Sequence, residues 1–135
     1  MNAQECLQIL RDVKDVTFAT TDENGRPRAR IIDVMLVEEG RLYFCTARGK
    51  DFYRELTEGG YVAVNGMNRA FQMVRLEGKA RKLGEQKRWI DRIFYYTSLH
   101  RMWEVQPKLP AEVHRPAGGT SGARRRQQCA GDSSL

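Results

Sequence analysis

The stretch 41–59 reads RLYFCTARGKDFYRELTEG and carries the clearest structural pattern in the chain. Its first residues are aromatic or aliphatic, which is typical of a buried strand, and residues 51–58 place apolar side chains at helical spacing. Gly59 and Gly60 then provide a helix stop signal. The sequence therefore predicts a strand, a short turn and a helix, in that order.

The predicted turn, TARGK at 46–50, combines a hydroxyl, two cations and a glycine immediately before the first N–H groups of the helix. A helix N-terminus attracts anions through its unpaired N–H donors and its dipole. Two interpretations stay open at this point. The turn, with Arg48 and Lys50, is either a phosphate-binding site or a solvated basic turn in which Asp51 caps the helix.

The composition indicates one soluble globular domain. The chain has 135 residues, 41% of them hydrophobic and 30% charged, and it contains neither an apolar run long enough to span a membrane nor a secretory signal. Three cysteines (Cys6, Cys45 and Cys129) show no metal or redox spacing, so we expect reduced thiols and a cytoplasmic location. No metal or hydrolase motif is present, and we assign no catalytic residue and no metal ligand.

The rest of the pattern is rich in hairpins. We expect helices over 3–13 and 85–99, and strands over 16–21, 28–37, 61–65 and 71–83. Asn24-Gly25 is a typical hairpin turn, and Gly78 suggests a bulge or bend in the last of these strands. Because no series of parallel crossovers is visible, the sequence predicts a mainly β protein with flanking helices, built on an antiparallel barrel.

The character of the sequence changes near residue 103. Beyond it the chain has prolines, little periodicity and then a segment of Gly, Ala, Arg, Gln and Ser. Such a composition buries too little apolar surface to offset the entropy of ordering. We therefore predict a barrel domain over 1–103 and an irregular, disordered tail over 104–135.

The order of the motifs resembles that of the pyridoxamine 5′-phosphate oxidase-like flavoproteins, which are FMN-binding split β-barrels. The matching segments are GRPRAR at 25–30, LYFCT at 42–46 followed by Lys50, and QMVRLEGKA at 72–80. The resemblance covers about residues 3–99. It implies a homodimer that binds FMN in a groove between its subunits. Family members usually continue into a further strand that completes the barrel, and we find no such strand in this sequence.

The resemblance also implies a set of cofactor-binding residues: Arg30, Ile31, Ile32, Asp33, Thr46, Ala47, Lys50, Gln72 and Met73. Arg30 and Lys50 would contact the FMN phosphate, which suits a bidentate guanidinium and a compact ammonium. The segment 31–33 would lie beside the ribityl chain and ring, and the segment 46–47 would contribute hydrogen bonds. One residue of 72–73 would approach from the long strand.

These expectations favour an FMN-dependent oxidoreductase that acts on a small molecule, because a flavin carries the redox chemistry and requires no general base from the protein. One alternative is a flavin or haem carrier without turnover. Another is a small barrel that binds nucleic acid by stacking bases on exposed rings. Its candidate aromatics, Phe18, Tyr43, Phe44 and Phe71, fall inside predicted strands, where burial is the simpler interpretation. We therefore expect neither nucleic-acid nor membrane partners.

Overall fold

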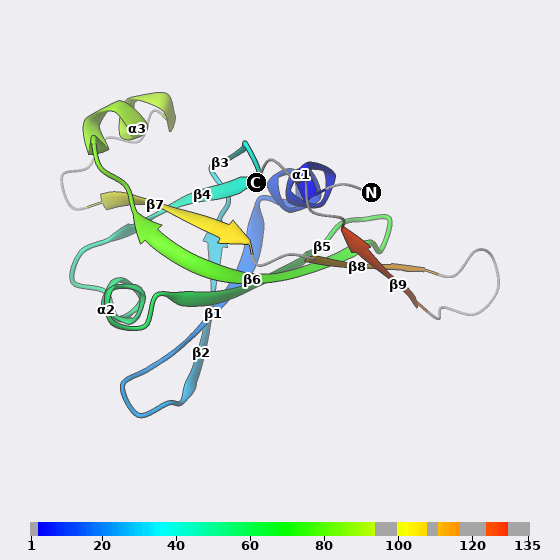
Figure 1. Cartoon of the computed structure of the whole chain (residues 1–135), viewed down its shortest axis with the longest axis horizontal. Helices are drawn as coiled ribbons and strands as arrows, with labels where there is room; N and C mark the ends of the chain where they lie inside the picture. Colours follow the sequence, from blue (N-terminus) through cyan, green and yellow to red (C-terminus); the bar gives the residue numbers. More distant parts are fainter. Residues whose placement is uncertain (1–2, 94–99, 108–110, 117–123, 130–135) are drawn as a thin grey trace.

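The computed structural model describes residues 3–93, 100–107, 111–116 and 124–129, with side chains described for 3–92 and 101–107. Within these residues the chain forms three helices and nine strands (Figure 1). In chain order they are α1 (Ala3–Val13), β1 (Asp15–Thr21), β2 (Pro27–Asp33), β3 (Leu36–Glu38), β4 (Arg41–Ala47), α2 (Asp51–Glu58), β5 (Tyr61–Met67), β6 (Met73–Lys82), α3 (Gln86–Ile93), β7 (His100–Pro107), β8 (Ala111–Pro116) and β9 (Arg124–Cys129).

The strands form one antiparallel sheet. Its main path runs β2-β1-β5-β6-β7-β4-β3, and β8 pairs with both β6 and β9. The sheet is strongly curled, as the bend of β6 shows in Figure 1. This arrangement is a half-barrel with flanking helices and confirms the predicted fold class. None of the described helices is long and apolar enough to cross a membrane.

The predicted strand over 28–37 is divided into β2 and β3. The break follows from two backbone hydrogen bonds: Val34 N–H donates to the Lys14 carbonyl at 2.8 Å, and Met35 N–H donates to the Tyr43 carbonyl at 2.8 Å. The chain thereby leaves its pairing with β1 and begins a pairing with β4. A single alternating pattern in the sequence does not reveal this change of partner, because both strands place their side chains with the same period.

Gly78 does not mark a bulge, which was one of the two predicted possibilities, whereas the other, a bend, agrees with the curvature of β6 in Figure 1. The β5–β6 register passes through Gly78 without interruption, and the β6–β7 register ends there with the pair Gly78 and Pro107. A glycine is required at this position because the backbone of β7 approaches it closely. A Cβ atom at residue 78 would lie 2.2 Å from the carbonyl oxygen of Gln106, so no larger side chain fits without movement of the backbone.

The further strand that we did not find in the sequence is present as β7. It lies between β4 and β6 and pairs with both. It runs from His100 to Pro107 and therefore extends past residue 103, and Glu104 and Val105 are buried within it. Strands β8 and β9 also occur where an irregular tail was predicted. The predicted helical residues 94–99 and the tail residues 108–110, 117–123 and 130–135 lie outside the described residues. A domain boundary near residue 103 stays a prediction, and β7 crosses that position.

The core lies between the curled sheet, α1 and α2. Three aromatic rings from different elements meet there: Phe18 of β1, Phe44 of β4 and Phe52 of α2, with centroid separations of 4.8 to 6.0 Å. Each such buried side chain stabilises the fold by roughly 1.5–3 kcal/mol relative to an exposed one. Phe52 thereby fixes the first turn of α2 directly after the end of β4.

Candidate functional site

A cleft of about 590 Å³ lies between the end of β4, the start of α2 and the edge strand β2. Its size falls within the roughly 300–1,000 Å³ typical of small-molecule sites. The residues that line it are Arg30, Ile31, Ile32, Cys45, Thr46, Ala47, Gly49, Lys50, Asp51 and Phe52. Six of the nine residues predicted to bind the cofactor are therefore brought together here: Arg30, Ile31, Ile32, Thr46, Ala47 and Lys50.

The β4–α2 turn leaves the N-terminus of the helix uncapped by a side chain. Lys50 is the N-cap residue, has extended backbone angles and makes no capping hydrogen bond. Asp51 does not cap the helix as one interpretation of the sequence expected; its carboxylate lies 3.4 Å from Arg54. The first N–H groups of α2 lack intrahelical partners and lie at the edge of the cleft.

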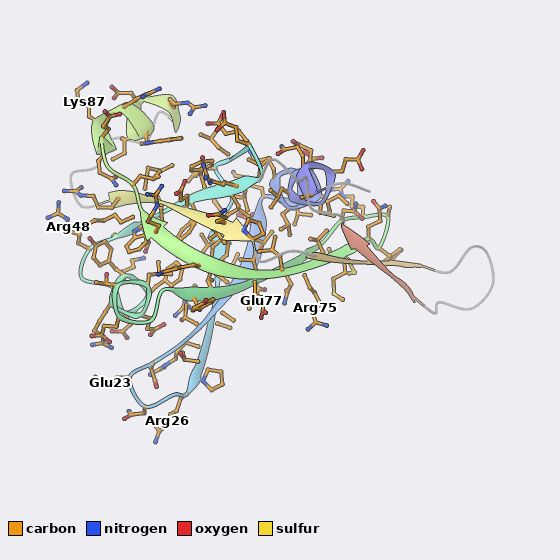
Figure 2. All side chains as sticks on the ribbon, in the orientation of Figure 1. Glu23, Arg26, Arg48, Arg75, Glu77 and Lys87 are labelled. Carbon is orange, nitrogen blue, oxygen red and sulfur yellow. The ribbon has the colours of Figure 1, made fainter. Side chains whose placement is uncertain are left out.

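The two cations of the turn differ in position. Lys50 is exposed, lines the cleft and forms no ion pair within the part of the chain that the structure describes. Arg48 does not line the cleft, and Figure 2 shows its side chain projecting outward from the molecule. Lys50 is therefore the cation of this turn that is available to a bound anion.

Arg30, on β2, is held by several contacts on the inner side of the cleft. Its guanidinium donates hydrogen bonds to the Thr20 hydroxyl at 2.7 Å and to the Glu55 carboxylate at 2.7 Å, with a longer bond of 3.5 Å to the Phe18 carbonyl. The guanidinium carbon also lies over the Phe52 ring. Its side chain keeps 22% of its surface exposed, so Arg30 is fixed in direction while still reaching the cleft.

Glu55 is the partner that the sequence analysis missed. It lies on the buried face of α2 beside Phe52 and Leu56, and its side chain is only 2% exposed. Desolvation opposes the ionised form of Glu55, but hydrogen bonds from Thr20 and Arg30 outweigh it and lower the pKa below its ordinary value. A charged residue on the apolar face of an amphipathic helix was the sequence signal that could have identified it.

The neutral wall of the cleft comes from β2 and the end of β4. Ile31 is 63% exposed, Ile32 is half-buried, and the buried residues Thr46 and Ala47 end β4. Cys45 is half-buried and lines the same cleft. Burial, with a smaller contribution from Asp33, raises the pKa of Cys45 to about 11, so its thiol stays protonated at neutral pH.

Three predicted site residues lie elsewhere in this single chain. Asp33 does not line the cleft; it faces Asp15 across the β1–β2 pair, and the hydrogen bond between the two side chains, followed by burial, raises the pKa of Asp33. Gln72 accepts a hydrogen bond from the Asn68 side chain in the β5–β6 turn. Met73 lines a different pocket beside β1 and β5.

Three of the four aromatic residues considered for base stacking are buried. Phe18, Tyr43 and Phe44 are buried as expected, whereas Phe71 is 57% exposed at the β5–β6 turn. No group of three or more metal-ligating side chains occurs among the described residues.

Cys6 takes part in a disulfide bond, so the expectation of three reduced thiols is wrong for this residue. The cysteines therefore no longer support a cytoplasmic location.

Comparison with solved structures gives relatives of the same fold. The chain is similar to a NimC/NimA family protein from Clostridium acetobutylicum, with a TM-score of 0.70, 17% identity, and 94% of this chain and 92% of that chain covered. It is similar to a heme binding protein from Mycobacterium smegmatis, with a TM-score of 0.65, 18% identity, and 95% and 58% covered. It is also similar to a pyridoxamine 5′-phosphate oxidase-related, FMN binding protein from Nostoc punctiforme PCC 73102, with a TM-score of 0.60, 9% identity, and 93% of each chain covered.

At these identities the structural likeness shows the fold alone. No curated protein matches the sequence. The family model for pyridoxamine 5′-phosphate oxidase, in contrast, matches residues 3–114, which is most of the chain and includes every residue of the cleft. The chain therefore belongs to the pyridoxamine 5′-phosphate oxidase family.

Proposed function

We propose that this protein is an FMN-binding flavoprotein, that it acts as an oxidoreductase on a small molecule, and that it works as a homodimer. The observation that carries the proposal is the position of Arg30, Thr46 and Lys50 in one cleft at the N-terminus of α2. A single cleft thus offers a guanidinium, a hydroxyl, an ammonium and free helix N–H groups, which is a donor set that suits a phosphate ester.

Lys50 and the first turn of α2 would hold the FMN phosphate. The ammonium has no carboxylate partner among the described residues, so no ion pair within them competes with a bound dianion. Arg30 has five N–H donors and three hydrogen bonds to protein, which leaves two donors for a ligand. Both basic residues predicted for the phosphate therefore retain capacity for it.

Ile31 and Ile32 would cover the less polar part of the cofactor, and Thr46 would supply a hydroxyl to its polar edge. When bound, FMN supplies the hydride-transfer chemistry, and the protein holds and orients it. The protonated thiol of Cys45 gives this wall of the cleft a neutral, weakly polar group. No residue of the described chain is needed as a general base in this scheme.

A second copy of the chain would complete the site. The outward face of the β2-β1-β5-β6 sheet exposes Ile31, Tyr61 and Met67, which are 63%, 67% and 44% exposed. Large exposed apolar side chains gathered on one face favour an interface between proteins. Because Gln72 and Met73 lie away from the cleft of their own chain, their proposed contacts with the flavin require the other subunit.

Absorbance spectroscopy tests the cofactor directly. We expect the purified protein to be yellow, to release FMN on denaturation, and to bind added FMN again once refolded. A colourless protein that takes up no FMN would contradict the proposal. A protein with a haem Soret band and no flavin would instead favour a haem carrier.

Steady-state assays with nicotinamide donors then separate an oxidoreductase from a carrier. An oxidoreductase should oxidise a nicotinamide donor in the presence of an acceptor, at a rate that follows its FMN content. A protein that binds FMN stably and oxidises no donor would be a carrier. Sedimentation at several concentrations tests the homodimer in the same samples.

A further inference from the structure

We propose that Glu55, together with Thr20, is a positioning residue that fixes the direction of the Arg30 guanidinium toward the cleft. This inference rests on the proposed function, because its measured effect is on flavin affinity. It assigns a role in ligand binding to two residues that do not line the cleft.

The three side chains form a closed set of hydrogen bonds across three elements. Arg30 of β2 donates to Thr20 of β1 and to Glu55 of α2, each at 2.7 Å, and the Thr20 hydroxyl donates to the same carboxylate oxygen of Glu55. The side chain of Glu55 is 2% exposed, and Thr20 is 6% exposed. Both partners of Arg30 are therefore shielded from water, and hydrogen bonds to buried groups are stronger than those at a surface.

The network leaves the guanidinium little freedom. An arginine side chain on an edge strand would normally sample many rotamers and extend into solvent. Here one edge of the guanidinium is bonded to Glu55 and Thr20, and its face covers the Phe52 ring. The two remaining donors consequently point along a restricted set of directions before any ligand arrives, which reduces the entropy lost on binding.

Glu55 is not placed to react with a ligand. It does not line the cleft, and its nearest polar partners are Thr20 and Arg30. Its negative charge also balances Arg30 in the free protein, which would otherwise hold a partly buried cation without a partner. The role that fits these contacts is to act through Arg30, so removal of Glu55 should have no effect on the ligand once Arg30 is gone.

A double-mutant cycle tests this dependence. FMN affinity is measured by flavin fluorescence for the full-length wild type, E55Q, R30M and the double variant R30M/E55Q. The matched control is E58Q, which removes the same charge from an exposed position one turn along α2. Thermal unfolding is recorded for every variant, so that a loss of affinity can be compared with a loss of stability.

We expect E55Q and R30M each to weaken FMN binding about tenfold, the lower end of the range for a hydrogen bond to a charged group. In the R30M background, E55Q should change the affinity by less than about twofold, because its effect passes through Arg30. T20V should weaken binding less than E55Q does. E58Q should bind as the wild type does.

Two results would overturn the inference. If E55Q binds FMN as tightly as E58Q, or if it weakens binding equally with and without Arg30, then Glu55 does not act by positioning that side chain. A wild-type protein that binds no FMN would overturn the proposed function and this inference together. The wild-type measurement therefore tells the two failures apart.

Discussion

The guanidinium carbon of Arg30 lies 4.3 Å from the centre of the Phe52 ring. The same ring packs against Phe18 and Phe44, so one side chain belongs both to the core and to the wall of the cleft. Stability and ligand geometry are therefore linked at this residue. A change of shape at position 52 should affect both.

Phe52→Leu should lower the free energy of unfolding by about 1–2 kcal/mol, because leucine fills less of the buried space and removes the cation–π contact. Urea denaturation measures the change. Tyr53→Phe is the control: the tyrosine hydroxyl accepts a 3.3 Å hydrogen bond from exposed Lys82, and loss of this surface contact should change the free energy of unfolding by no more than about 0.5 kcal/mol. Equal effects of the two substitutions would show that Phe52 is not part of a close-packed core.

Lys50→Ala should weaken FMN binding by about 1.5–3 kcal/mol, the typical value for a hydrogen bond to a charged group. Riboflavin, which lacks the phosphate, should bind Lys50→Ala and wild type equally. Titration of both flavins into the apoprotein measures the difference. Lys87→Ala, on exposed α3, is the matched control and should leave both affinities unchanged. An equal loss for FMN and riboflavin would place the phosphate away from Lys50.

Cys45 should react slowly with iodoacetamide. Its pKa is raised from 9.0 to about 11, so the thiolate fraction near pH 8 is about 100-fold below that of an ordinary cysteine, and the rate should fall accordingly. Labelling of the native and the urea-unfolded protein, read by peptide mass spectrometry, gives the ratio. Bound FMN should slow the reaction further, because Cys45 lines the cleft. Fast labelling that FMN does not change would contradict both statements.

Asp15→Asn should stabilise the protein at neutral pH. The raised pKa of Asp33 means that the native state holds more protons than the unfolded state between the ordinary value of 3.8 and the raised value, so stability falls as pH rises through that window. Removal of the facing charge should recover less than about 1 kcal/mol, because the Asp33 side chain is 41% exposed and lies 4.0 Å from Lys14.

Chemical denaturation of the wild type and Asp15→Asn between pH 3 and pH 8 measures this gain, which should shrink as the pH falls through the raised pKa of Asp33, because a protonated Asp33 carries no charge to repel its neighbour. Glu23→Gln, in the exposed β1–β2 turn, is the charge-matched control and should show no comparable gain. A gain from Asp15→Asn that is the same at every pH would not come from the carboxyl pair.

Gly78→Ala should destabilise the protein by about 2–3 kcal/mol, because the new methyl group would overlap the Gln106 carbonyl of β7. Gly84→Ala, where no atom lies within 4 Å of the added carbon, should be nearly neutral. Thermal unfolding of the two variants gives the comparison. Equal stability of the Gly78→Ala and Gly84→Ala variants would show that the backbone of β7 does not lie close to residue 78.

The sequence alone was sufficient for the elements whose pattern is local. The strand, turn and helix of 41–59 follow from apolar spacing and glycine stops, and they occur as predicted. The resemblance to a family predicted that Arg30 and Lys50 lie at one site, and both line the cleft. No spacing rule could have predicted this, because the two residues lie on different elements. The contact between them and a cofactor stays a prediction.

The parts that were missed depend on tertiary contacts. Strand β7 carries four consecutive buried residues, from Met102 to Val105, because it lies between two other strands; such a run has no alternation to reveal it. Glu104 is tolerated there because Arg81 and Arg41 reach it from neighbouring strands. Glu55 was overlooked for the same reason, since its partner Arg30 lies 25 residues earlier in the chain.

The hydrogen bonds from α2 to β1 and β2 also make the cleft dependent on a helix of only eight residues. Local opening of that helix would release Arg30 and remove Lys50 from its place in one event. Occupancy of the cleft should therefore slow amide hydrogen exchange throughout Asp51–Glu58, including residues that no ligand can touch.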